Sequence, residues 1–97
     1  MPNDDIYTIE QVERMEAEEA AAIVKRGIRS GQEFRCVRKV AGFRANEIAT
    51  MFDVTPETVS RWESGKQPLP RTVLFALAEL YEHPQVTRRK LETLAAG

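Results

Sequence analysis

The residues from Thr55 to Arg61 offer the clearest chemistry in this chain, because small polar groups and one arginine follow one another within about two helical turns. Arg61 can form a bidentate pair with O6 and N7 of guanine, and the Glu57 carboxylate can accept from N4 of cytosine. Hydroxyl groups can donate to bases or phosphates, and a proline can offer only apolar contact, as to a thymine methyl. The pattern predicts base reading in the major groove of double-stranded DNA by six residues: Thr55, Pro56, Glu57, Thr58, Ser60 and Arg61.

Plainer explanations stay open for the charged members of this set. Arg61 is also compatible with a solvated side chain or a phosphate contact, and Glu57 with a favourable interaction with the helix dipole. Enzymatic chemistry has little support, since the chain contains no paired carboxylates, phosphate-binding loop or nucleophile motif. Its only histidine, His83, stands beside Pro84 at a predicted helix end. We therefore expect no enzyme activity, no catalytic residues, no cofactor and no metal site.

Two short helices joined by a tight turn must position these side chains. The first is predicted over about residues 45–52, because its apolar residues share one face at the helical period, and Asp53 and Val54 form the turn. The second, over residues 56–64, has an N-cap oxygen, a proline and an acidic residue in succession at its start.

The second helix has a clear end and a clear inner face. Gly65 ends it, because glycine readily takes the left-handed conformation found after helices. Val59 and Trp62 form an inward apolar stripe, so Trp62 is expected in the core and the six candidate base readers face outward.

The rest of the chain predicts further helices and no strands. The expected helices cover about residues 9–26, 31–41, 45–52, 56–64, 71–82 and 85–94. Ser30 is expected to cap the second of these, with Glu33 completing a capping box. The helix over 71–82 is apolar on most sides, so one of its faces is a candidate dimer surface.

These elements define a fold class and a division of the chain. We predict an all-α fold, in the form of a compact five-helix domain with an extra N-terminal helix. Residues 1–29 are expected to form an acidic N-terminal helical arm. Residues 30–97 are expected to form a DNA-binding domain with a C-terminal helix.

The formal net charge of −1 conceals an uneven distribution. Residues 1–22 hold seven acidic residues against one arginine, a net charge of −6, and residues 23–97 hold thirteen basic against eight acidic residues, a net charge of +5. The basic part has the sign needed to displace counterions from DNA phosphates. One cysteine excludes an internal disulfide. No signal peptide or membrane span is visible, so we expect a cytoplasmic protein without a membrane partner.

The segment Thr58-Val59-Ser60-Arg61-Trp62-Glu63-x-Gly65-Lys66 resembles the recognition helix of the lambda-repressor/Xre-type helix-turn-helix family. The resemblance covers roughly residues 34–84. It implies that helix 56–64 enters the major groove while helix 45–52 lies across the phosphate backbone. It also implies a structural ion pair between Arg38 and Glu63, which fixes the recognition helix rather than touching DNA.

The expected phosphate contacts are Arg44, Asn46 and Lys66, which would position the protein without specifying sequence. Members of the resembled family often carry a phosphate-bonded glutamine near the start of the first of the two helices. Here Ala45 occupies that place, so Arg44 or Asn46 is expected to replace the contact.

The spacing from Trp62 through Lys66 to Pro84 is similar to that of the DNA-binding domain of MqsA-like antitoxins, without the cysteines of their zinc module. This resemblance implies a repressor of its own operon, with a toxin as a possible protein partner; a phage-type repressor is equally open. One recognition helix reads about four base pairs, so we expect a homodimer on an inverted-repeat operator. Its interface is open between the C-terminal helices and the N-terminal helix. A protein-interaction adaptor on the same scaffold is the alternative, suggested by the acidic arm and the apolar helix.

Overall fold

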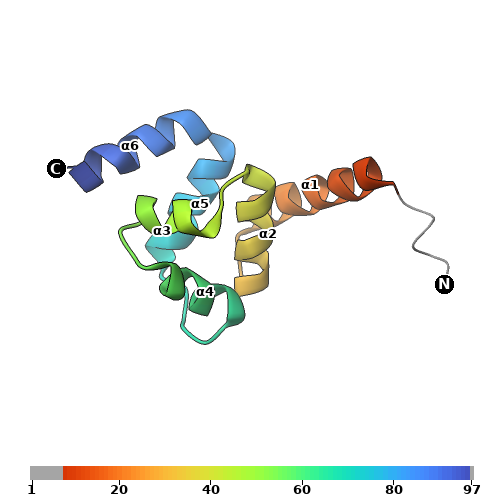
Figure 1. Cartoon of the computed structure of the whole chain (residues 1–97). Coiled ribbons are helices and arrows are strands. Elements are labelled where there is room, and N and C mark those ends of the chain that lie inside the picture. Colours follow the sequence, from red (N-terminus) through yellow and green to blue (C-terminus); the bar gives the residue numbers. More distant parts are fainter. Residues whose placement is uncertain (1–7, 97) are drawn as a thin grey trace.

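Residues 8–96 are described by the computed structural model, and every regular element in them is an α-helix. The helices are α1 (Ile9–Arg26), α2 (Gly31–Ala41), α3 (Ala45–Met51), α4 (Pro56–Ser64), α5 (Arg71–Glu82) and α6 (Pro84–Ala96). Helices α2 to α6 form the body, and α1 precedes it (Figure 1). This confirms the predicted all-α fold with an extra N-terminal helix. The first seven residues of the predicted acidic arm lie outside the described part.

Local capping chemistry explains most of the helix ends. Thr8 and Gln11 cap α1 reciprocally: the Thr8 N–H donates to Gln11 Oε1 (2.8 Å) and the Gln11 N–H donates to Thr8 Oγ1 (3.1 Å). Thr55 caps α4 by accepting from the Thr58 N–H (3.1 Å), and Gly65 ends it with a φ of 83°. The predicted boundaries of α1, α4 and α5 are confirmed. Helix α3 ends one residue earlier than predicted, and α6 is longer than the predicted 85–94 at both ends.

The predicted capping box of α2 is wrong in one half. Ser30 accepts from the Glu33 N–H (3.2 Å), as expected. The Glu33 carboxylate, however, accepts from the Arg29 N–H (2.7 Å) instead of the Ser30 N–H, and forms an ion pair with Arg26 (2.5 Å). The reason is that Arg26 ends α1 close to the start of α2, so its guanidinium reaches the carboxylate. Hydrogen bonds from Arg26 and from the Arg29 N–H hold the pKa of Glu33 below its usual value.

The core lies where α2, α3, α4 and α5 meet. Its largest fully buried side chains are Phe34 and Val37 from α2, Ile48 from α3, Val59 from α4, and Leu77 and Leu80 from α5. The Phe34 and Trp62 rings pack edge to face, with centroids 6.1 Å apart and planes at 69°. This packing holds the short helices α3 and α4, which would be marginal alone.

The turn between α3 and α4 depends on one residue in the left-handed region. Asp53 has a φ of 57°, a conformation that aspartate tolerates better than most residues. The chain then closes with a backbone hydrogen bond from the Val54 N–H to the Ala49 carbonyl (2.9 Å). Thr55 is thereby delivered as the N-cap of α4.

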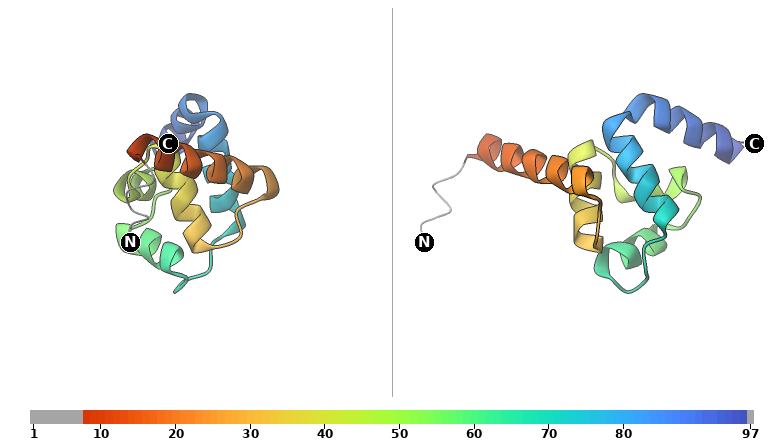
Figure 2. Two further views of the ribbon diagram at one scale, coloured as in Figure 1. Left: turned by 90° about the vertical axis from the view of Figure 1, so that its right-hand side faces the viewer. Right: turned by 180° about the vertical axis from the view of Figure 1, so that it is seen from behind.

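Only the C-terminal half of α1 is covered by the body. Ala20 and Ile23 are buried against α2, and the Cys36 thiol donates to Glu19 Oε1 (3.8 Å). Partial burial and the nearby glutamates raise the pKa of Cys36. The N-terminal half of α1 extends away from the other helices, and α6 extends toward the opposite end of the molecule (Figure 2). The long axis is 52 Å against 29 and 24 Å for the other two.

Helix α5 is less exposed than its apolar sequence suggests. Its inner residues Leu77 and Leu80 are buried, and Phe75 is its one exposed large hydrophobic residue (68 %). The part of α5 that stays available to a second copy is thus the region around Phe75. That α5 forms a dimer surface remains a prediction. Over residues 8–96, no helix combines the length and the apolarity that a membrane crossing requires.

The junction between α1 and α2, where Glu33 contacts Arg26 and the Arg29 N–H, gives a pH-dependent prediction. The pKa of Glu33 is lowered on folding, so the junction stabilises the fold above the ordinary carboxylate pKa, and this stabilisation is lost as the pH falls through the lowered value. Glu33→Gln is expected to lower the free energy of unfolding at pH 7, and the difference from the parent should shrink below about pH 4. Urea unfolding across this range measures both. A difference that stays constant with pH would contradict the role of the carboxylate charge.

Candidate nucleic-acid interface

Helix α4 is divided into a buried face and an exposed face. Val59 is fully buried and Trp62 is 3 % exposed, which confirms their predicted inward positions. Five of the six candidate base readers are exposed: Thr55, Pro56, Glu57, Ser60 and Arg61. The helix lies along one edge of the molecule, at the end of the body away from α1 and α6 (Figure 1). Its exposed face is therefore open to a large ligand.

Thr58 is the candidate whose position is least open. It is half-buried, and its hydroxyl lies 2.9 Å from the Thr55 hydroxyl. Thr55 also accepts from the Thr58 N–H, so the cap uses part of the hydrogen-bonding capacity of both residues. The free donors and acceptors at this surface accordingly belong chiefly to Glu57, Ser60 and Arg61.

The Arg38 guanidinium joins three parts of the fold. Its Nε donates to Glu63 Oε2 (2.6 Å) and its Nη2 donates to Glu63 Oε1 (3.2 Å), which makes a bidentate pair between α2 and α4. Its Nη1 donates to the Phe43 carbonyl (2.9 Å) in the link between α2 and α3. The two side chains are only 10 % and 12 % exposed. The arrangement is what the resemblance implied, with the carbonyl contact as an addition.

A close backbone contact at Gly31 also sets the position of α4. A Cβ atom at this position would overlap the carbonyl oxygens of Trp62 and Glu63. Only glycine therefore allows the first turn of α2 to lie against the last turn of α4. The sequence analysis assigned no such role to Gly31, because the contact depends on a helix some thirty residues further along the chain.

The three candidate phosphate contacts are exposed and lie at two separate places. Arg44 and Asn46 stand at the start of α3, where the Arg44 N–H donates to Glu47 Oε1 (2.8 Å). Lys66 directly follows the C-cap of α4. Their side chains have no structural partner among residues 8–96 that would occupy their charged or polar ends.

A groove beside α4 contains polar residues that the sequence analysis did not single out. It has a volume of about 370 Å³ and is lined by Gln32, Arg35 and Arg38 of α2 and by Ser60, Glu63 and Ser64 of α4. Gln32, Arg35 and Arg38 follow one another at intervals of three residues, which places them on one side of α2. This three-residue spacing is the feature of the sequence from which the polar side of α2 could have been predicted. Because Glu63 is paired with Arg38, the charge left free in the groove is the exposed Arg35.

No group of three potential metal ligands occurs in the part of the chain that the structure describes. The chemistry of this surface is thus that of hydroxyl, carboxylate, guanidinium and ammonium groups on a rigid helical frame. These groups can hydrogen-bond base edges and neutralise phosphates.

Comparison with known proteins adds a family to this geometry. A family model described as a helix-turn-helix domain matches residues 30–91, from the N-cap of α2 into α6. No curated protein and no solved structure matches the chain.

The Arg38 contacts give a stability prediction. Arg38→Ala leaves the Glu63 carboxylate largely buried without its partner, so the free energy of unfolding should fall by about 3–5 kcal/mol. Arg35→Ala, one turn earlier and exposed, should change it by less than about 0.5 kcal/mol. Urea unfolding of both variants measures the difference.

The double variant Arg38→Met/Glu63→Met separates a coupled pair from independent contributions. Removing both charges leaves no buried carboxylate without a partner. The double variant should therefore lose less stability than the sum of the losses measured for Arg38→Met alone and Glu63→Met alone. Additive losses would show that the two side chains stabilise the fold independently.

Proposed function

Because the chain belongs to the helix-turn-helix domain family, we propose that it is a sequence-specific regulator of transcription that binds double-stranded DNA. Helix α4 enters the major groove, and α3 lies across the phosphate backbone. The observation that supports this most directly is the division of α4: Val59 and Trp62 hold its inner face, and Arg61 is exposed on its outer face.

Within this proposal the outer residues of α4 read base edges. Arg61 is the main reader, through a bidentate pair with guanine, and Glu57 accepts from cytosine N4. Pro56 offers apolar contact, and Ser60 donates to a base or a phosphate. Thr55 and Thr58 contribute less, because their hydroxyls are hydrogen-bonded to each other.

Positively charged and polar residues around α4 hold the phosphate backbone. Arg44 and Asn46 contact it at the start of α3, and Lys66 contacts it after α4. Arg35 is a further phosphate contact, because it lines a groove together with Ser60 of α4. These contacts supply affinity and register, while the exposed face of α4 supplies specificity.

The biological setting of the proposal is repression. Residues 30–97 bind an inverted-repeat operator as a homodimer, because one helix reads too few base pairs alone. Residues 1–29 form the acidic arm. The chain acts as a non-enzymatic, cytoplasmic, antitoxin-like autoregulator, and a toxin is the corresponding protein partner.

A second candidate function rests on a specific observation. Ile9 and Met15 of α1 are 79 % and 51 % exposed, so the arm presents apolar surface among acidic residues. A protein-interaction adaptor would use this surface and would not need DNA. The two functions differ in whether the chain binds duplex DNA at low salt.

Affinity for random duplex DNA across a salt series tests the function and the role of Lys66 together. The parent chain should bind at low salt and lose affinity steeply as salt rises. Lys66→Ala should weaken binding to every sequence equally and reduce the slope of log K against log salt by about one. Lys25→Ala, which removes the same charge from α1, is the matched control and should leave the slope unchanged. No binding by the parent chain at low salt would favour the adaptor.

Arg61→Ala tests the reading of bases. Operator sites are first selected from a random DNA pool with the parent chain, which should yield an inverted repeat with half-sites about 34 Å apart. On such a site the variant should lose about 1–3 kcal/mol of binding free energy and its preference at one base pair per half-site. An equal loss on all sequences would make Arg61 a phosphate contact.

A further inference from the structure

Five of the six exposed large hydrophobic residues of the described chain lie on its first and last helices. Three lie on α1, one on α5 and two on α6: Ile9, Val12, Met15, Phe75, Val86 and Leu94. Helices α2, α3 and α4, which carry the proposed DNA surface, have none among residues 8–96. Nothing among residues 8–96 covers these side chains, and exposed apolar surface of this kind is a candidate site for a partner.

The apolar face of α1 continues beyond the body that covers it. Ile9 and Val12 lie on the same face of α1 as Ala20 and Ile23. Together with Glu16 between them, these positions follow one another at intervals of three or four residues. Ala20 and Ile23 are buried against α2, whereas Ile9 is 79 % and Val12 43 % exposed. The same face that docks α1 on its own body is thus left unpaired over the first half of the helix.

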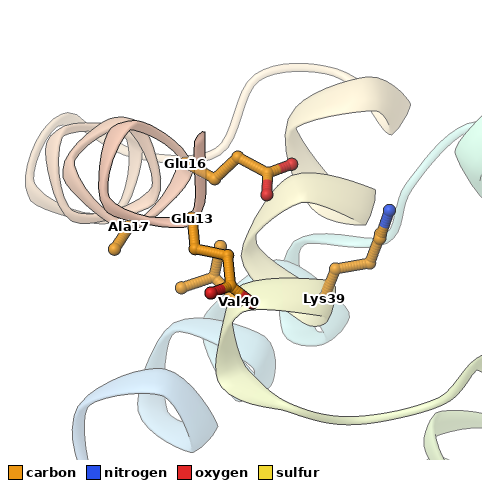
Figure 3. A pocket seen from close by; sticks show the side chains of 5 residues that line it. All are labelled: Glu13, Glu16, Ala17, Lys39 and Val40. Atoms are coloured by element: carbon orange, nitrogen blue, oxygen red, sulfur yellow. The ribbon is translucent and has the colours of Figure 1, made fainter. Parts of the chain in front are cut away.

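A groove runs between this part of α1 and the end of α2. It has a volume of about 370 Å³ and is lined by Glu13, Glu16, Ala17, Lys39 and Val40. Glu13 and Glu16 extend from α1 toward α2, which lines the other side of the groove with Lys39 and Val40 (Figure 3). The groove therefore combines a small apolar surface with two carboxylates and the Lys39 ammonium group, which leaves it one net negative charge. A helix that presents an apolar side chain next to positive charges would complement it.

Helix α6 presents such a face. Val86, Arg89 and Lys90 follow one another at i, i+3 and i+4, so they lie on one side of the helix. All three are exposed; Leu91 packs on the body, and Lys90 stands at the border of this face, because it also lines the groove between α5 and α6. Glu92 is the one acidic residue of α6, and it forms an ion pair with Arg88 (3.6 Å), which leaves Arg89 and Lys90 as the free charges of this face.

We propose that the groove between α1 and α2 of one copy binds the outward face of α6 of a second copy. Arg89 and Lys90 meet the carboxylates of Glu13 and Glu16, and Val86 packs against Val40. Helices α1 and α6 point to opposite ends of the 52 Å long axis (Figures 1 and 2). Two antiparallel copies therefore make the same contact twice and close as a symmetric dimer.

This inference supplies the interface of the homodimer in the proposed function and rests on that homodimer. Its test uses mass and contains no DNA, so it can fail while DNA binding stands. A chain that dimerises as proposed and binds no DNA would overturn the DNA-binding function alone.

A charge exchange between the two ends tests the contact. One variant carries Glu13→Lys and Glu16→Lys, and the other carries Arg89→Glu and Lys90→Glu. Each would set like charges against each other in its own homodimer, which should weaken self-association at least about tenfold. In an equimolar mixture both contacts again pair opposite charges, so a heterodimer should form. Sedimentation equilibrium of the full chain measures the masses, and far-UV circular dichroism checks that both variants are helical.

The matched control is Glu10→Lys/Glu18→Lys, which makes the same charge change on α1 at positions that do not line the groove. It should dimerise like the parent. The proposal is overturned if the parent is monomeric, if either charge-reversed variant still dimerises, or if the mixture fails to restore the dimer. Masses above the dimer would show an open head-to-tail chain and would overturn the closed arrangement.

Discussion

The guanidinium of Arg38 is the group on which the arrangement of α4 depends. It pairs with both carboxylate oxygens of Glu63 and also donates to the Phe43 carbonyl, so one side chain joins α2, the link that follows it, and α4. Charges this far from solvent are tolerated only while their partners stay in place. Any tilt of α4 that separated Glu63 from Arg38 would leave the Glu63 carboxylate without a partner and Arg38 with the Phe43 carbonyl alone. Gly31 adds a steric limit, since the backbones of α2 and α4 touch there.

The sequence predicted the elements well where the signals are local. Thr55 and Pro56 start α4 and Gly65 ends it, and each acts through its own backbone geometry or an immediate neighbour. The half of a capping box assigned to Glu33 was wrong because Arg26, on another helix, competes for the carboxylate. The role of Gly31 depends on a contact between distant segments, which a local pattern does not encode.

The residues of the candidate site likewise differ in how far the sequence alone could predict their roles. The Arg38–Glu63 pair came from a resemblance, and the geometry confirms it. The base and phosphate roles of Arg61, Arg44 and Lys66 stay predictions, because these side chains are exposed and only a bound ligand would distinguish the two roles. The groove at Arg35 needed the structure, since it arises where α2 passes beside α4.

The separation of the two faces of α4 has a consequence for the evolution of related sequences. Val59 and Trp62 fix the helix from inside, whereas Glu57, Ser60 and Arg61 make no contribution to the core. Exchanges at the outer positions therefore leave folding almost untouched. A gene duplicate could acquire a new target by drift at a few codons, with the scaffold kept as it is.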